Sequence, residues 1–267
     1  MEKGRNNMDG LSLHYYTIAG ESWQNKSAAT GFGEQLYFLG LKKALYMDEL
    51  VSKHSAIMDQ YDKDKRVDLL VDEWGIWTDV EPGTIPGHLF QQNSMRDALI
   101  ASSTLDILNK HAERVKMANI AQMVNVLQAM ILTQGNKMVL TPTYHVFKMY
   151  KVHQDATLLP SKLVSEPYQL GSDQVPAISS SASVDQNGKI HVTLSNLNPS
   201  KEIRLEINFS GKGITKINSG TVLTAAAFNS VNTFEKPDAV VPASFKNAKK
   251  LSANKLEVNI PSKSVVV

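Results

Sequence analysis

Residues 66–74 decide the fold class of this chain. The stretch reads Arg66-Val67-Asp68-Leu69-Leu70-Val71-Asp72-Glu73-Trp74, a short apolar run that ends in two acids. A run of this length and composition is typical of a strand that is buried on both faces in a parallel sheet. The stretch therefore predicts an α/β arrangement, because parallel strands need crossover helices to connect them.

The flanking segments extend this pattern in both directions. Residues 9–16 alternate apolar and polar side chains as a strand does, and apolar residues recur at helical spacing from about Gly33 to Tyr61. A second helix is predicted from about His88 to Val115, after a stretch rich in Pro and Gly. Residues 118–132 fit a helix or a strand equally well. A βαβαβ order with right-handed crossovers accounts for the whole region.

The chain changes character near Tyr144. Beyond it, three segments alternate with period two and are separated by turn signals such as Asn187-Gly188: residues 189–195, 203–209 and 256–260. Short alternating strands at this spacing predict an antiparallel β-sandwich. We therefore expect two parts, residues 1–143 with the α/β pattern and residues 144–267 with the sandwich.

Composition narrows the possible partners and cofactors. The chain has 267 residues, 42% of them hydrophobic and 20% charged, which is enough apolar surface for one large domain or two ordinary ones. The absence of cysteine excludes disulfides, thiolate zinc sites and iron–sulfur clusters. Because 28 basic side chains face 26 acidic ones, the net charge of +2 gives no field that would attract nucleic acid.

The sequence also gives no reason to expect a membrane partner. No apolar stretch follows the charges near Met1, so there is no secretory signal, and no window approaches the ~18 apolar residues of a spanning helix. Cytoplasmic, periplasmic and secreted proteins all tolerate a chain without cysteine, so the compartment stays open.

The strongest candidate for chemistry is Glu73. A hydrophobic strand delivers this carboxylate to its carboxyl end between Trp74 and Trp77, and in α/β barrels that end of a strand is where catalytic groups lie. A carboxylate beside indole rings suits sugar chemistry, since aromatic faces stack on sugar rings and the carboxylate can attack or stabilise an oxocarbenium-like carbon. The alternative is a solvated acid at a strand end, beside tryptophans of the core.

His14 and Tyr16 form a second candidate pair. Two residues apart in a strand, they face the same side, so an imidazole and a phenol can meet one ligand or one carboxylate. A Tyr16 hydroxyl that donates to Glu73 would keep this carboxylate ionised and oriented as a nucleophile. The alternative is an aromatic pair packed at the rim of a barrel.

Other polar features give weaker signals. Gln122 can hydrogen-bond sugar hydroxyls, although buried amides are more often structural. The mixed charges of residues 62–66 are explained by a solvated turn. Four histidines show no HExxH spacing and therefore give little support to a metal site: His54, His88, His111 and His145.

Taken together, four motifs in the same order resemble the α-L-arabinofuranosidases of glycoside hydrolase family 51. They are residues 9–17, 72–77, 118–127 and 232–240. The resemblance implies a (β/α)8 TIM barrel followed by a jelly-roll-type antiparallel β-sandwich. In fold class the chain would be α/β plus all-β, with residues 1–143 as the last three strands of the barrel and residues 144–267 as the sandwich.

The same resemblance implies a retaining, exo-acting hydrolase that releases arabinofuranosyl residues from arabinoxylan or arabinan through a covalent intermediate. Glu73 resembles the nucleophile of the family, and His14 and Tyr16 resemble the pair that holds it. Gln122 resembles a substrate-contacting amide, and Trp77 resembles a wall of the arabinose pocket. No cofactor is implied. The partner would be an arabinose-containing polysaccharide or oligosaccharide, and homo-oligomers are common in the family.

One departure from the family pattern stands out. Retaining hydrolysis needs a second carboxyl group, which acts as acid and then as base, and in this family it belongs to an Asn-Glu dipeptide on an earlier strand. This chain has no Asn-Glu dipeptide. A whole barrel needs roughly 250 residues, whereas only residues 1–143 precede the sandwich. We therefore expect the C-terminal half of such an enzyme, with little or no turnover on its own.

Two other functions stay open at this point. A related barrel could cut β-glucan or xylan internally, since only the loops around the pocket separate the two activities. Alternatively, the sandwich could be a non-catalytic module that binds carbohydrate or a partner chain. Binding faces of that kind usually present several exposed aromatic residues, and beyond Tyr168 the chain has no further Tyr or Trp and four phenylalanines.

Overall fold

The computed structural model describes residues 1–211 and 213–267. Three parallel strands, ordered β1-β2-β3, run through the first half of the chain: β1 (Gly10–Ile18), β2 (Asp68–Trp77) and β3 (Val115–Ile120). The helices α1 (Glu34–Ala44) and α2 (Tyr46–Tyr61) connect β1 to β2, and α3 (Met95–Lys110) connects β2 to β3. The predicted βαβαβ order is confirmed.

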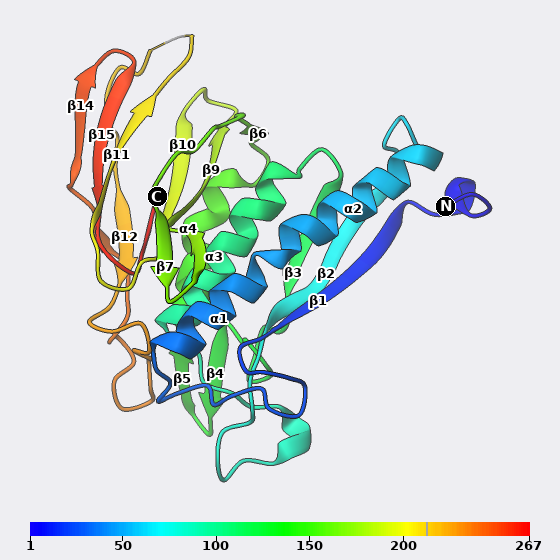
Figure 1. The fold of residues 1–267 in the computed structure, drawn as a ribbon, viewed down its shortest axis with the longest axis vertical. Helices are drawn as coiled ribbons and strands as arrows, with labels where there is room; N and C mark the ends of the chain where they lie inside the picture. Colours follow the sequence, from blue (N-terminus) through cyan, green and yellow to red (C-terminus); the bar gives the residue numbers. More distant parts are fainter. Residues whose placement is uncertain (212) are drawn as a thin grey trace.

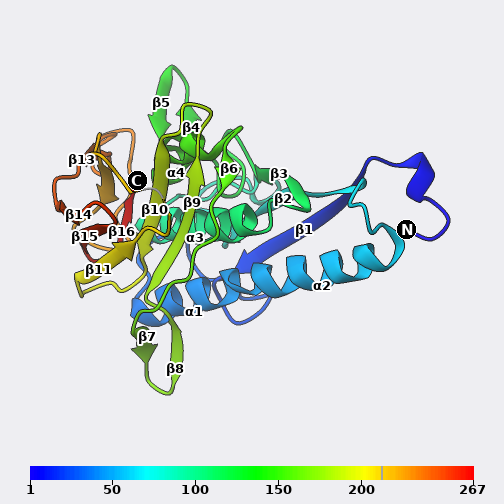
Figure 2. The ribbon, with the colours of Figure 1, turned by 90° about the horizontal axis from the view of Figure 1, so that it is seen from above.

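Local chemistry explains where these elements begin and end. The helical pattern of residues 33–61 is divided at Leu45 into α1 and α2, which continue along β1 (Figures 1 and 2). The helix predicted from His88 begins only at Met95, because Ser94 and Asp97 form a capping box there. Residues 115–120 form a strand, and the chain then becomes irregular as far as the hairpin of β4 (Ile131–Gln134) and β5 (Lys137–Leu140).

The second half of the chain forms two antiparallel sheets. One has six strands in the order β13-β12-β16-β10-β9-β6 and the other three in the order β11-β15-β14. The six-stranded sheet consists of β6 (Thr157–Leu158), β9 (Ile178–Val184), β10 (Ile190–Asn196), β12 (Thr221–Thr224), β13 (Ala243–Ser244) and β16 (Ser264–Val266). The other consists of β11 (Ile203–Asn208), β14 (Ala248–Ser252) and β15 (Lys255–Ile260). An apolar core that includes Leu194, Leu205 and Val258 joins them into the predicted sandwich.

The helices α3 and α4 (Pro142–Tyr150) lie between the parallel sheet and the sandwich (Figure 1). Every residue of α3 from Met95 to Leu108 is buried, since this helix contacts α1, α2 and α4 as well as β2, β3, β9 and β10. The boundary expected between residues 143 and 144 falls inside α4. Buried residues of both halves also form one large hydrophobic core.

Smaller elements complete the fold. Three 3-10 helices span Arg5–Asn7, Pro86–His88 and Lys151–His153, and a second hairpin is formed by β7 (Pro167–Leu170) and β8 (Asp173–Pro176). In the part of the chain that the structure describes, no helix has the length and apolar character needed to cross a bilayer. Within the same residues, β1 and β3 are the two edges of the parallel sheet.

Candidate active site

The parallel pairing of β1 and β2 brings three of the predicted site residues together. His14 lies opposite Glu73 in the register, and Tyr16 lies opposite Gly75. The Tyr16 hydroxyl donates a hydrogen bond to Oε1 of Glu73, and Nδ1 of His14 lies 3.0 Å from Oε2 of the same carboxylate. Each oxygen of Glu73 therefore has its own partner on the neighbouring strand.

Two further residues belong to this network, and sequence reasoning did not single them out. Nε2 of His14 lies 3.1 Å from Oδ1 of Asp72, and the Ser12 hydroxyl donates to the same oxygen at 2.7 Å. The signal for Ser12 was its position two residues before His14, which places it on the same face of the strand. The imidazole thus lies between two carboxylates that are adjacent in sequence.

The electrostatics of the network follow from these contacts. The Ser12 hydrogen bond is the main cause that lowers the pKa of Asp72, and burial only partly opposes it. Burial and the hydrogen bond to Glu73 raise the pKa of Tyr16 well above its ordinary value, so the phenol keeps its proton and acts as a donor. A carboxylate that accepts from a phenol is held in one orientation.

Aromatic rings form one wall beside Glu73. The rings of Tyr16 and Trp77 meet edge to face with centroids 5.0 Å apart, and Trp23 meets Trp77 in the same way at 5.4 Å. Trp23, which sequence reasoning missed, is 54% exposed. Trp74 points away from Glu73 and into the core, where its buried indole stacks on Phe147. Of the two tryptophans that flank Glu73, only Trp77 lies on the side of the network.

Gln122 lies near this end of the sheet without joining the network. The amide of the preceding residue, Ala121, donates to the Trp74 carbonyl at 2.8 Å, which places the segment beside β2. The Gln122 side chain is exposed and makes no hydrogen bond to any described residue. The structure therefore brings together His14, Tyr16, Glu73 and Trp77 and leaves Gln122 at the margin.

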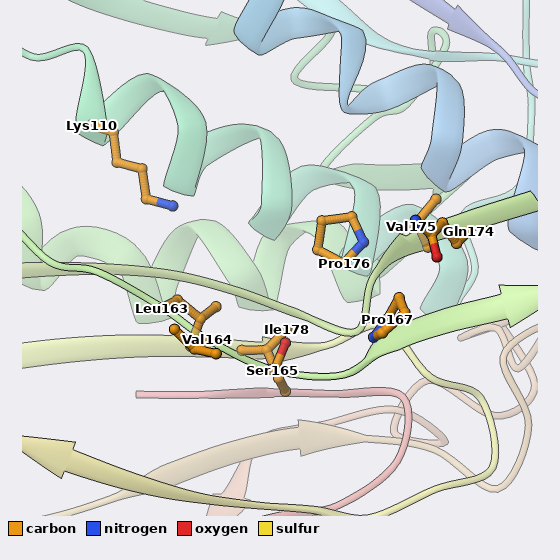
Figure 3. A pocket seen from close by; sticks show the side chains of 9 residues that line it. All are labelled: Lys110, Leu163, Val164, Ser165, Pro167, Gln174, Val175, Pro176 and Ile178. Atoms are coloured by element: carbon orange, nitrogen blue, oxygen red, sulfur yellow. The ribbon is translucent and has the colours of Figure 1, made fainter.

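The network is open to solvent. The side chains of His14, Asp72 and Glu73 are 50%, 33% and 38% exposed. A carboxylate held in one orientation beside aromatic faces can act as a nucleophile toward a sugar carbon. The surface groove shown in Figure 3 lies elsewhere, between the end of α3 at Lys110, residues 163–167 and the strands β8 and β9, and none of the predicted site residues lines it.

Comparison with known proteins gives a consistent result. Residues 72–264 match the family of the α-L-arabinofuranosidase C-terminal domain. The chain is 49% identical, over its whole length, to a Bacteroides ovatus protein named intracellular exo-α-L-arabinofuranosidase, of which it covers 51%.

Solved structures agree with this match. The fold superposes on the glycoside hydrolase family 51 arabinofuranosidase from Xanthomonas axonopodis pv. citri with a TM-score of 0.95 and 50% identity, covering 99% of this chain and 53% of that one. The α-L-arabinofuranosidase from Thermotoga maritima, at 22% identity, shares the fold with a TM-score of 0.75, over 97% of this chain and 52% of its own. The chain thus spans about half the length of the relatives that it matches.

Proposed function

This chain belongs to the α-L-arabinofuranosidases of glycoside hydrolase family 51, and from that premise we propose that it supplies the nucleophile of a retaining exo-α-L-arabinofuranosidase. The observation that carries the proposal is the Glu73 carboxylate in the carboxyl-terminal half of β2, held by Tyr16 on one oxygen and approached by His14 on the other. Glu73 attacks the anomeric carbon and forms the covalent glycosyl–enzyme intermediate, which water then hydrolyses.

The surroundings of Glu73 define the remaining roles. Tyr16 and His14 orient the carboxylate, Trp77 forms a wall of the sugar pocket, and Gln122 contacts a sugar hydroxyl when substrate is present. No Asn-Glu dipeptide occurs in this sequence, so the carboxyl that protonates the leaving oxygen comes from outside these residues. The chain alone therefore has little or no turnover.

The parallel sheet supports a partial barrel. A strand followed by a helix is the repeating unit of a (β/α)8 barrel, and this region has three such parallel strands in succession. Among the described residues, β1 and β3 both present an unpaired edge. We assign residues 1–143 to the last three strands of such a barrel and residues 144–267 to the sandwich that packs on it. Strands of the remaining half close the barrel and cover the exposed network.

The substrate class follows from the names of the relatives. The Bacteroides ovatus protein is named an exo-α-L-arabinofuranosidase. A Streptomyces lividans relative is named an exo-α-(1→5)-L-arabinofuranosidase, and a Bifidobacterium longum relative an exo-α-(1→6)-L-arabinofuranosidase. We therefore propose terminal arabinofuranosyl residues of arabinan or arabinoxylan as the substrate. The linkage differs among relatives, so it is not assigned.

The test is hydrolysis of 4-nitrophenyl α-L-arabinofuranoside by this chain alone and after coexpression with the part of the Bacteroides ovatus relative that it does not match. We expect turnover only in the assembled pair, because removal of a general acid costs ~10²–10⁴ in rate. Glu73→Ala in the pair should abolish turnover, and added azide should restore it with formation of a glycosyl azide of inverted configuration.

Two outcomes would contradict the proposal. The first is that the two coexpressed parts form a complex, as judged by size-exclusion chromatography, but the complex hydrolyses nothing. The proposed activity would then be wrong. A Glu73→Ala pair that hydrolyses the substrate at the unmodified rate would show that another residue is the nucleophile.

A further inference from the structure

The strand that carries Glu73 extends beyond its neighbour on one side. On the side of β1, pairing continues as far as Ile18 opposite Trp77. On the side of β3, the last pair is Trp74 with Ile120. The end of β2, from Gly75 onward, therefore has a strand neighbour on one side only. This end connects Glu73 to Trp77 of the aromatic wall.

Two buried glutamines take the place of the missing strand. The Ile76 amide donates to Oε1 of Gln128 at 2.8 Å, and the Ile76 carbonyl accepts from Nε2 of Gln91 at 3.0 Å. Oε1 of Gln91 also accepts from the Thr78 amide at 2.9 Å. Because a primary amide has a donor and an acceptor, each side chain can serve the backbone as a neighbouring peptide group does.

Gln128 is anchored in the helical layer. Nε2 of Gln128 donates to the Asp97 carbonyl at 2.8 Å and to the Thr143 hydroxyl at 3.1 Å. These partners lie in the first turns of α3 and α4. The segments that carry the glutamines lie side by side, since the Leu127 amide donates to the Leu89 carbonyl at 2.9 Å. The end of β2 is thus tied to the most buried helices of the chain.

Gly75 shows how closely the amide approaches the strand. This glycine has a φ of +146°, and a Cβ there would lie 3.2 Å from Oε1 of Gln128. The exposed fractions of Gln91 and Gln128 are 1% and 0%. Buried amides of this kind are costly unless all their partners are present, so their geometry constrains the backbone between Glu73 and Trp77.

We propose that Gln91 and Gln128 are positioning residues that fix the end of β2, and with it the orientation of Glu73 and Trp77. The proposal rests on the function assigned to Glu73. It acts through the backbone: a shift of residues 75–77 moves Trp77 relative to Tyr16, whose hydroxyl holds Glu73. Misplacement of a reacting group by about 1 Å can cost on the order of 10²-fold in rate.

The first readout uses this chain alone, labelled with 5-fluorotryptophan. Its three tryptophans give three fluorine resonances, assigned by Trp→Phe variants. Gln128→Met and Gln91→Met keep the side-chain volume but remove the amide. We expect each to shift the Trp77 resonance and to speed hydrogen exchange of residues 74–78 by at least about 10-fold, since the protecting acceptors are lost.

Gln92→Met is the matched control. Gln92 precedes α3 like Gln91, and its amide also bonds to backbone, but to the Asn232 carbonyl and the Asn93 amide rather than to β2. This variant should leave the Trp77 resonance and the exchange of residues 74–78 unchanged. Gln128→Glu, which keeps an acceptor for the Ile76 amide, should recover part of the protection even if Gln128→Met folds poorly.

The second readout is kinetic, in the assembled pair. The Gln91 and Gln128 variants should lower kcat by about 10- to 100-fold with little change in KM, while Gln92→Met keeps both constants. If the pair has no activity, the assigned reaction fails but the exchange and fluorine results still report on β2. Two results would overturn the positioning role. One is unchanged exchange and an unmoved Trp77 resonance in both Gln91→Met and Gln128→Met. The other is changes of the same size in Gln92→Met.

Discussion

Acidic side chains just before β2 and in its carboxyl-terminal half lie in opposite surroundings. Near its amino end, Asp62 is fully buried and accepts hydrogen bonds from the Val67 amide at 2.8 Å and from Arg114 at 2.8 Å. Within β2, Asp72 and Glu73 are a third or more exposed. The buried acid is bound entirely by groups of this chain, whereas the exposed pair faces outward. We expect the charges around Asp62 to stabilise the fold, and we propose that the exposed pair meets the substrate.

A fourth acid, Asp106, makes the contrast clearer. It is buried in α3 against the six-stranded sheet and accepts hydrogen bonds from four hydroxyls: Tyr150 at 3.0 Å, Ser179 at 2.8 Å, Ser181 at 2.9 Å and Thr193 at 2.7 Å. Burial outweighs these donors and raises the pKa of Asp106 to about 6. Burial also opposes ionisation of Asp62, but hydrogen bonds from the Val67 amide and Arg114, together with the charge of Arg5, outweigh it and lower that pKa to about 2.

The largest expected effect comes from breaking the buried pair at the amino end of β2. Arg114→Met leaves Asp62 buried without its main cation, and loss of one partner of a buried ion pair typically costs about 3–5 kcal/mol. The measurement is the free energy of unfolding from urea titration. Arg204→Met is the matched control, because Arg204 pairs with Glu257 while 67% exposed and should cost at most about 1 kcal/mol. Equal losses in the two variants would refute the structural role of the buried end.

The next largest effect concerns Asp106 and pH. Its pKa is higher in the folded than in the unfolded state, so the folded state binds more protons between pH 4 and pH 6, and stability falls as pH rises through that window. The loss is about 2–3 kcal/mol for a shift of this size. The measurement is the free energy of unfolding in urea, for the unmodified chain and for Asp106→Asn, from pH 4 to pH 7.5. The difference in this free energy between the two proteins should change by about 2–3 kcal/mol over the range. A parallel pair of pH profiles would contradict the assignment.

Much of this architecture could be predicted from the sequence, because it follows from local patterns. Period-two alternation indicated β1 and three strands of the sandwich, β10, β11 and β15. An apolar run that ends in acids indicated β2, although the strand continues beyond Glu73 to Trp77. The spacing of His14 and Tyr16 placed both on one face, and the structure brings them to Glu73. These features need no knowledge of distant partners.

The features that sequence reasoning missed depend on partners far away in the chain. The interpretation of residues 62–66 as a solvated turn was wrong for Asp62, which is fully buried because Arg114, 52 residues later, supplies its cation. Gln91 and Gln128 follow no periodic pattern, and their partners in β2 are visible only once the strands are placed. Residues 118–132 stayed ambiguous because the segment changes from strand to irregular backbone within itself.

The smallest expected effect tests the exposed end of β2. Ser12→Ala removes the hydroxyl that donates to Asp72 at 2.7 Å, so the pKa of Asp72 should rise toward its ordinary value, since that hydrogen bond is the main cause of its lowering. Stability should change by no more than about 0.5 kcal/mol, because exposed sites contribute little. Carbon-13 NMR of the aspartate carboxyls, followed with pH, measures the first effect and urea unfolding the second. A loss of stability comparable to that of Arg114→Met would mean that both ends of β2 are structural, because the exposed carboxylates would then be needed for the fold. An unmoved Asp72 titration would show that Ser12 does not hold this carboxylate, and the network around His14 would then depend on Glu73 and Tyr16 alone.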